Sequence, residues 1–177
     1  HPVLDGVQSL LGRENFAADD VERIKVEAPA LATIMTDPEP VNMLAAKFSL
    51  PYAVATAVVH NSTDITAFYP DRLQDPETLA LSRRVDIIAD PEMDLRRYDY
   101  PAAKVAISLK DGRTLTEEVK AHHGDTENPA SREELVGKFK FLVKDVLGEE
   151  RAIRVVETVG HLDALGNIKE LTRLLKA

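Results

Sequence analysis

The sequence predicts an α+β fold, a two-layer α/β sandwich in which helices pack on a mixed or antiparallel sheet of about four strands. Apolar residues recur at helical spacing in some segments and alternate with polar residues in others, so helices and strands are mixed along the chain. Two alternating segments meet at Lys110-Asp111-Gly112, which is typical of an antiparallel hairpin. The chain has 177 residues, enough for one ordinary domain, and we expect residues 1–177 to form a single domain.

Helix and strand signals divide the chain into short segments. Helix starts are marked by Asp75 before Pro76 and by the capping box of Ser131 with Glu134. The predicted helices are residues 1–13, a turn or two at 30–35, then 50–59, 76–83, a helix from 132, 149–159 and 167–175. Alternating apolar and polar residues predict strands at 23–28, 85–89, 103–109 and 113–121.

The hairpin after residue 109 is predicted to contain a three-residue loop with Gly112 in the left-handed conformation. A two-residue loop would place Leu115 on the polar face of the partner strand, whereas the longer loop faces Leu115 to Ile107 and puts Val119 on the same side. Glu117 then falls on the apolar face, which indicates an edge strand or an interface.

The most apolar stretch is residues 44–59, LAAKFSLPYAVATAVV. A helix that is hydrophobic on every side must be buried, in a core or against another domain, and this one is too short to span a bilayer. Pro51 is tolerated in the first turn, which places Ser49 at the N-cap. Lys47, Ser49 and Tyr52 then surround the positive end of the helix dipole, and this arrangement suits an anion. The alternative is that Ser49 only caps, Lys47 is solvated and Tyr52 packs.

Composition excludes several classes of protein. The chain has 22 Lys plus Arg, 30 Asp plus Glu and no Cys. The resulting net charge of −8 disfavours a nucleic-acid partner, and the lack of Cys excludes disulfides and thiolate chemistry. We find no signal peptide and no membrane-spanning run, so we expect a soluble, cytoplasmic protein without a membrane partner. Because the first residue is His1 rather than Met, we expect a fragment or a processed product.

Other polar clusters are better explained without a specific function. The five histidines lack metal-site spacing, and a solvated strand end explains His122-His123. The pairs Arg83-Arg84 and Arg96-Arg97 could hold carboxylates, but exposed arginines are usually unspecific. Neither a glycine-rich phosphate loop nor a GxSxG motif is present.

The stretch AAKFSLPYAVATAVV resembles the signature of the MmgE/PrpD family, whose members include 2-methylcitrate dehydratase, cis-aconitate decarboxylase and iminodisuccinate epimerase. The resemblance covers essentially the whole chain. His1-Pro2 with Asp5 is similar to the family's HPxxDA opening, and four further segments follow in family order: ADDVERIKVE, VDIIADP, AAKVAISLKDGRTL and GDxENPxSxEELxxKF.

The resemblance is to the second, smaller domain of these enzymes, and the N-terminal helical domain is absent from this chain. It implies an active site in a cleft between the two domains. Tyr52 matches a family tyrosine that faces the cleft and is expected to be catalytic. Lys47 and Ser49 accompany it as substrate-binding residues, and His1 matches a histidine near the domain junction. The fragment alone is expected to be inactive, and the full-length protein to be a homodimer or another homo-oligomer.

The chemistry implied by the resemblance is that of a lyase acting on di- or tricarboxylic acids by acid–base proton abstraction, without a metal or an organic cofactor. The expected function is that of a 2-methylcitrate dehydratase, an enzyme of propionate metabolism. An epimerase acting on iminodisuccinate or a cis-aconitate decarboxylase is the alternative within the family. The alternative from another class is a non-catalytic ligand-binding or interaction domain, in which the chain would cover the helix at 50–59 by itself.

Overall fold

The structure is a computed structural model that describes residues 1–95 and 102–176. The pair Arg96-Arg97 singled out above lies outside the described residues. Contacts divide the chain into two compact units, His1–Asn128 and Pro129–Ala177. The single domain that the sequence predicts stays a prediction.

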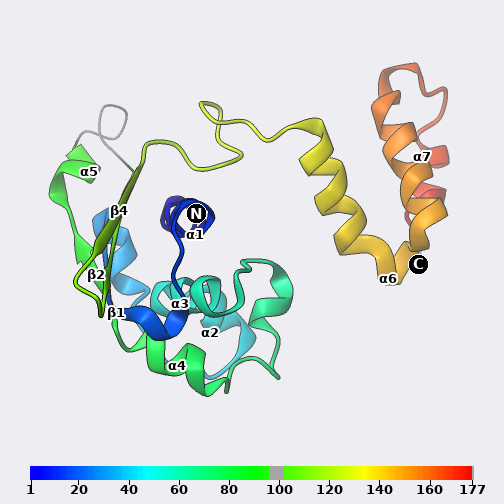
Figure 1. Ribbon diagram of the computed structural model, residues 1–177. Coiled ribbons are helices and arrows are strands. Elements are labelled where there is room, and N and C mark those ends of the chain that lie inside the picture. Colours follow the sequence, from blue (N-terminus) through cyan, green and yellow to red (C-terminus); the bar gives the residue numbers. More distant parts are fainter. Residues whose placement is uncertain (96–101, 177) are drawn as a thin grey trace. The chain divides into compact units, whose positions relative to one another are not determined.

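The first unit contains a four-stranded mixed sheet with the order β2-β1-β3-β4 (Figure 1). The central strand β1 pairs in parallel with β2, and the β1–β3 and β3–β4 pairs are antiparallel. The strands are β1 (Val21–Ala28), β2 (Val85–Ala89), β3 (Ala103–Leu109) and β4 (Thr114–Val119). The predicted α+β class with helices packed on a mixed sheet is therefore confirmed.

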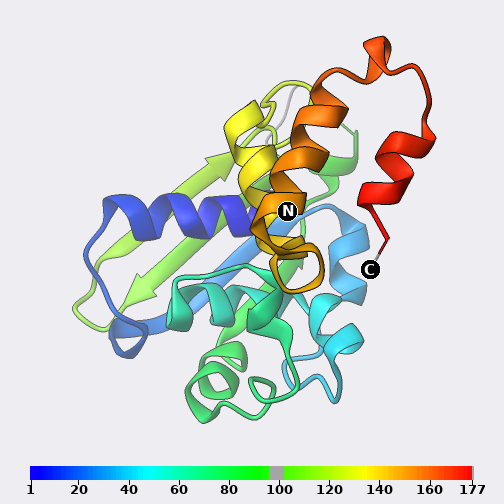
Figure 2. The same cartoon turned by 90° about the vertical axis from the view of Figure 1, so that its right-hand side faces the viewer.

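Helices cover one face of this sheet, as Figure 2 shows for α1. The helices of this unit are α1 (Pro2–Arg13), α2 (Met43–Lys47), α3 (Leu50–His60), α4 (Pro76–Ser82) and α5 (Pro91–Leu95), with 3-10 turns η1 (Ala18–Asp20), η2 (Ala30–Ile34) and η3 (Ile65–Phe68). Helix α1 lies very close to the sheet at Gly6, where an added Cβ would come within 3.1 Å of the Val105 side chain. A side chain at this position would require the Val105 side chain to shift slightly.

The core lies between the sheet and its helical layer. Alternate residues of β3 are buried, and those of β1 that face the helices are almost completely inaccessible. In α3 every residue from Pro51 to Val58 is buried. This confirms the sequence prediction that a helix without a polar face must be enclosed.

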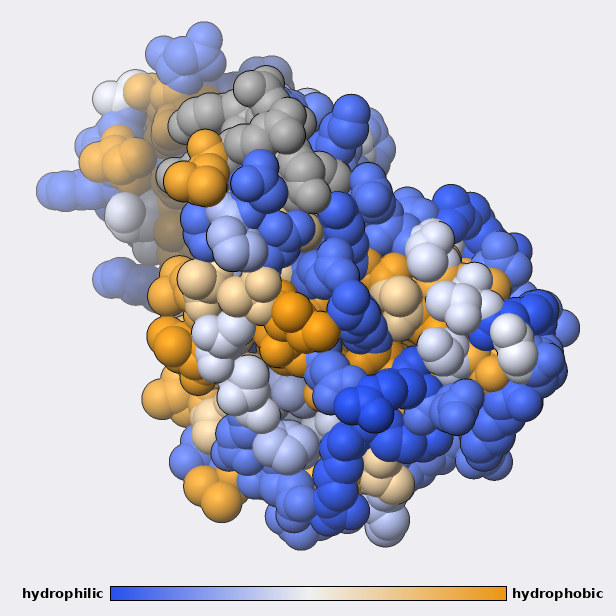
Figure 3. Space-filling view, turned by 90° about the vertical axis from the view of Figure 1, so that its left-hand side faces the viewer, coloured by the Kyte–Doolittle hydropathy of each residue, from blue (hydrophilic) through white to orange (hydrophobic). Residues whose placement is uncertain are grey.

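The opposite face of the sheet carries charged side chains. Arg23 pairs with Asp86, Lys25 with Glu27, and Lys104 with Glu118. The space-filling view shows hydrophilic residues running down the middle of this side, with hydrophobic residues gathered next to them (Figure 3). The first unit is therefore a two-layer structure with one polar sheet face.

The β3–β4 hairpin has the predicted bulged loop. Gly112 has a φ of +90°, and the Leu109 N–H donates to the Arg113 carbonyl at 2.8 Å. Leu115 is paired with Ile107, as the alternation required. Glu117 does fall on the apolar face of the edge strand, where Arg13 of α1 forms an ion pair with it at 2.7 Å. This pairing offsets the cost of placing a carboxylate there.

The second unit is a helical hairpin followed by a short helix. The helix α6 (Arg132–Gly160) is interrupted at Gly148, whose φ of 70° and ψ of 169° are not helical, so it is two helices in sequence. The capping box of Ser131 and Glu134 is present. A 3-10 turn η4 (Leu162–Ala164) and α7 (Lys169–Leu174) follow. The two predicted helices on either side of residue 148 are thus confirmed.

Several boundaries differ from the prediction by one or two residues. Strand β1 begins two residues earlier, at Val21, and β4 is shorter at both ends than the predicted 113–121. The sequence analysis also missed two short helices: α2, which begins at Met43, and α5, which begins at Pro91 shortly after β2. No helix in the described ranges is long and apolar enough to cross a membrane.

Candidate functional site

The N-terminus of α3 is built around Ser49. Its hydroxyl accepts the Tyr52 N–H at 3.1 Å and donates to the Asp37 carbonyl, and the residue is only 1% exposed. The predicted N-cap is therefore confirmed, with an additional bond to the loop before α2. Both hydrogen-bonding directions of this hydroxyl are already used within the chain.

The first-turn N–H groups of α3 have protein acceptors as well. Leu50 donates to the Met35 carbonyl at 2.9 Å, Pro51 has no N–H, and Ala53 donates to the Ser49 carbonyl at 3.0 Å. An anion at this end would gain from the helix dipole and from a nearby cation rather than from free N–H groups.

Tyr52 is enclosed rather than open to solvent. The residue is 1% exposed and packs with Ala46, Phe68 and Leu73, and its hydroxyl donates to the Arg72 carbonyl at 3.1 Å. Burial raises the pKa of the phenol, and the Asp75 carboxylate raises it further. The Thr56 hydroxyl and Arg72 act in the opposite direction and lower this pKa. Tyr52 therefore stays protonated around neutral pH in this environment.

A polar network connects the turn before α4 with the end of α3. The Arg72 carbonyl that accepts from Tyr52 also accepts the Asp75 N–H at 3.1 Å. Asp75 caps α4 through the Thr78 N–H, and its Oδ2 lies 3.3 Å from Nε2 of His60. Burial acts to raise the pKa of Asp75, but hydrogen bonds from Thr78 and the neighbouring His60 outweigh it and lower that pKa.

Lys47 and the residues around it form the exposed part of this region. Lys47 is the last residue of α2 and is exposed. Leu44 and Phe48 are 67% and 63% exposed, which is unusual for large apolar side chains in one short segment. The surface next to the buried Ser49–Tyr52 pair is therefore apolar with one cation.

A second polar group contains His1, His122 and Asp125. The ring of His1 contacts the His122 ring edge-on at 5.4 Å between centroids, and Nδ1 of His122 lies 3.4 Å from Oδ2 of Asp125. The Asp5 carboxylate accepts the His123 N–H, which ties α1 to this segment. Hydrogen bonds from Thr126 and from the Glu127 N–H hold the pKa of Asp125 below its usual value, so the carboxylate that faces His122 stays ionised.

Helix α1 connects the two groups. Leu4, one turn after His1, packs against the buried cluster that contains Tyr52. The hydrogen bonds bring only Ser49 and Tyr52 of the predicted site residues into direct contact.

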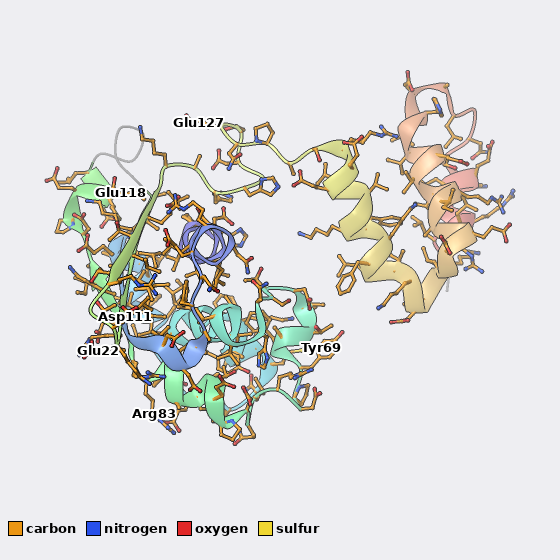
Figure 4. All side chains as sticks on the ribbon, viewed as in Figure 1. Glu22, Tyr69, Arg83, Asp111, Glu118 and Glu127 are labelled. Carbon is orange, nitrogen blue, oxygen red and sulfur yellow. The ribbon has the colours of Figure 1, made fainter. Side chains whose placement is uncertain are left out.

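A groove lies beside α1 and β4. Its volume is about 900 Å³, and acidic side chains from Asp5, Glu117, Glu118 and Glu127 outnumber Lys120 along it. Glu118 and Glu127 are labelled in Figure 4. A carboxylate substrate would be repelled from this groove, so the region around Lys47 is the better candidate for an anion. No group of three or more potential metal ligands occurs within residues 1–95 and 102–176.

Both arginines of the pair Arg83-Arg84 bind other groups of the chain. Arg83 points outward at the end of α4 (Figure 4) and pairs with Glu39 at 2.7 Å, and Arg84 donates to the Val21 and Ala80 carbonyls. These contacts are structural, in line with the unspecific role that the sequence favoured.

Comparison with known families decides the assignment. The family description "MmgE/PrpD C-terminal domain" matches residues 1–162, which is most of the chain. The chain belongs to the MmgE/PrpD family.

Curated relatives of this MmgE/PrpD domain are named cis-aconitate decarboxylases, so the family is enzymatic. The mouse protein is 27% identical over 93% of the chain and 33% of its own length. The human protein is 24% identical over 93% of the chain and 34% of its own length, and one from Aspergillus terreus is 30% identical over 77% and 28%. The chain therefore spans about a third of the length of these relatives.

The structure of this MmgE/PrpD domain adds polar residues that the sequence reading passed over. His122 was attributed to a solvated strand end, yet it lies between His1 and Asp125. The sequence signal for the contact between His122 and Asp125 was their spacing of three residues across Gly124. Asp75 was recognised as a cap, but its contact with His60 depends on how α3 and α4 pack and has no local signature.

Proposed function

We propose that this chain is the C-terminal domain of a cofactor-independent lyase that acts on di- or tricarboxylic acids. In this proposal Tyr52 transfers a proton in a cleft shared with an N-terminal helical domain. Lys47, Ser49 and His1 contribute to binding the substrate. The observation that carries the proposal is the family match over residues 1–162, which includes all four residues.

The site region is consistent with acid–base chemistry. Tyr52 is a protonated hydroxyl in a water-poor cluster at the positive end of α3, where charge that develops on a substrate is stabilised more strongly than in water. In the present arrangement its hydroxyl donates to the Arg72 carbonyl, so turnover requires that this bond be exchanged for one to the substrate. Lys47 supplies a full positive charge on the exposed side.

The surface around Lys47 supports a partner domain. The apolar side chains there remain exposed in this unit, including Leu44 and Phe48. A helical domain seated over them would bury this patch and close the second wall of the cleft. A homo-oligomeric full-length protein and a cytoplasmic location are further parts of this proposal.

The reaction type is proposed as dehydration, resembling that of 2-methylcitrate dehydratase. Decarboxylation of cis-aconitate is the second candidate, because the curated relatives described above carry that name. Epimerisation of iminodisuccinate is the third. All three begin with proton chemistry next to a carboxylate, so the same residues serve each of them.

The deciding experiment is an activity screen of the longest protein that the gene encodes. The substrates are 2-methylcitrate, citrate, cis-aconitate and iminodisuccinate, with loss of water, release of carbon dioxide and change of configuration measured separately. Tyr52→Phe is expected to reduce turnover strongly while the protein stays folded. Unchanged turnover in Tyr52→Phe would remove Tyr52 from the catalytic set.

The burial of Tyr52 favours a second candidate function, a non-catalytic ligand-binding or interaction domain. In that case α3 needs no other domain to cover it, and residues Pro51 to Val58 are indeed buried within this chain. Calorimetric titration of the chain with citrate separates the two. Weak or absent binding is expected of half an active site, and tight binding by the chain alone would support the second candidate.

A further inference from the structure

One buried polar atom in the α3 region has no hydrogen bond of full geometry. The side-chain oxygen of Thr56 is inaccessible, the residue is 1% exposed, and its hydroxyl interacts with the Tyr52 phenol. A threonine inside a helix usually donates to the carbonyl four residues earlier, which here belongs to Tyr52. Leaving a buried hydroxyl unpaired destabilises a fold, so a native chain that keeps one has a reason to do so.

Thr56 and Tyr52 are neighbours on one helix. They are four residues apart in α3, so their side chains lie on the same face one turn apart. Both are 1% exposed. The Thr56 hydroxyl also acts to lower the pKa of the phenol, which is the effect of a donor that favours the charged form.

The remaining surroundings of Tyr52 leave the donor role to Thr56. The charged groups that act on the phenol are Arg72 and Asp75, both from the turn before α4. The Arg72 carbonyl is an acceptor and would repel a phenolate, and the Asp75 carboxylate disfavours it. The Arg72 guanidinium favours the phenolate through its charge, whereas Thr56 acts on it through a hydrogen bond. The other neighbours are apolar and come from α1, α2, η3 and the helix α4: Leu4, Ala46, Ala67, Phe68 and Leu79.

We propose that Thr56 is a positioning residue for Tyr52. Its buried hydroxyl, which has no hydrogen bond of full geometry in the present arrangement, donates to the phenolate oxygen when Tyr52 gives up its proton. The inference rests on the proposed function, in which Tyr52 is the proton donor. In the step, the Tyr52 O–H bond breaks and its proton joins the substrate, which leaves a phenolate that accepts from Thr56. Water returns the proton as the product leaves, and the O–H rotates back to the Arg72 carbonyl.

The test is the titration of Tyr52 in the folded chain, which needs no substrate. Replacing the tyrosines by 3-fluorotyrosine brings their titration into a range where the chain stays folded, and fluorine NMR then reports each ring. The Tyr52 signal is assigned by its loss in Tyr52→Phe. Thr56→Val keeps the shape of the side chain and removes the hydroxyl, and Thr56→Ser keeps the hydroxyl.

In Thr56→Val the fraction of Tyr52 phenolate at a fixed pH is expected to fall about tenfold, because a hydrogen bond to a charged group is lost. Thr56→Ser is expected to titrate like the parent chain. Ser82→Ala is the matched control, since it removes another buried hydroxyl, one that donates to the Pro38 carbonyl, and should leave the Tyr52 titration unchanged. Should Thr56→Val fail to fold, Thr56→Ala gives the same comparison.

A Tyr52 titration that is the same in Thr56→Val as in the parent chain would overturn the proposal and make Thr56 a packing residue. In the longest protein that the gene encodes, Thr56→Val is expected to lower kcat with little change in KM, and Thr56→Ser to restore it. Activity that survives Tyr52→Phe refutes the role of Tyr52 in turnover, whereas the titration result stands in either case. Failure of the proposal for Thr56 and failure of the proposed role of Tyr52 in turnover can therefore be told apart.

Discussion

Replacing Ser49 by alanine removes two hydrogen bonds at the start of α3. The hydroxyl accepts the Tyr52 N–H and donates to the Asp37 carbonyl, and it is buried. Alanine can do neither, and water has little access to replace the lost partners. We therefore expect Ser49→Ala to destabilise the chain more than the loss of an exposed cap would.

The expected loss of stability is about 2 kcal/mol. Loss of a serine N-cap typically costs about 1 kcal/mol, and a carbonyl left without its donor in a partly buried place costs about 1 kcal/mol more. For a chain of this size, 2 kcal/mol corresponds to a fall of roughly 4–8 °C in the midpoint of thermal unfolding. Ser49→Gly should lose less stability at the N-cap, because glycine is itself a tolerated N-cap. The stability that it does lose therefore reports mainly the missing bond to the Asp37 carbonyl.

The assay is urea unfolding followed by circular dichroism, with thermal unfolding as a second measure. Ser131→Ala is the matched control: Ser131 also caps a helix through the N–H three residues later, but it is exposed. We expect it to cost clearly less than Ser49→Ala. A loss below about 0.5 kcal/mol in Ser49→Ala would refute the reasoning, because it would mean that the two bonds contribute nothing net.

Three further predictions concern the stability of the fold. Folding lowers the pKa of Asp75 below its ordinary value of 3.8, so its carboxylate stabilises the fold above that pH. Asp75→Asn should be less stable at neutral pH, and its urea midpoint should converge with that of the parent as the pH falls below 3.8 and through the lowered pKa. Gly112→Ala should cost about 1 kcal/mol because φ is +90° there, whereas Gly137→Ala in α6, with nothing within 4 Å of the added Cβ, should be neutral or stabilising in thermal unfolding. Val54→Ala should cost about 2 kcal/mol in urea unfolding, because Val54 is 0% exposed and its two lost methyl groups leave a cavity. Equal stability of the Gly112 and Gly137 variants, or of Val54→Ala and the parent, would contradict the last two.

The features predicted well are those decided within a few residues. The caps at Ser49, Asp75 and Ser131 each join a side chain to an N–H three residues on, so the sequence alone contains both partners. The bulged hairpin follows from alternation on either side of Gly112. The two missed helices, α2 and α5, had signals of this kind. Asn42 accepts the Ala45 N–H at the start of α2, and Asp90 accepts the Glu92 N–H at the start of α5.

Pairings between distant segments could not be predicted in the same way. Strands β1 and β2 pair in parallel although about sixty residues of loops and helices separate them, and apolar alternation is the same for parallel and antiparallel partners. The contact of His1 with His122 joins the two ends of the first unit. It depends on α1 lying against β4, which the spacing of residues in either element does not specify.

The site illustrates the same limit. Sequence alone grouped Lys47, Ser49 and Tyr52 correctly at the start of α3, because they are adjacent in the chain. It could not tell that the Tyr52 hydroxyl reaches the Arg72 carbonyl, since that bond requires a turn twenty residues away. Burial of Tyr52 raises the pKa of its phenol further above neutral and so favours the protonated form.

Ser49 and Tyr52 hold the fold together with the same atoms that the proposed reaction would use. Loss of activity in Ser49→Ala would therefore not identify a substrate contact, because the cap and the bond to Asp37 disappear with it. Ser49→Thr keeps the hydroxyl and the cap, so a loss of activity without a loss of stability in that variant would point to contact with the substrate. For Tyr52, the phenylalanine variant loses the bond to the Arg72 carbonyl, which costs about 1 kcal/mol of stability. If the variant stays folded, a fall in its turnover belongs to substrate binding or the chemical step rather than to the fold. The assignment of roles at α3 thus requires stability and turnover to be measured on the same variants.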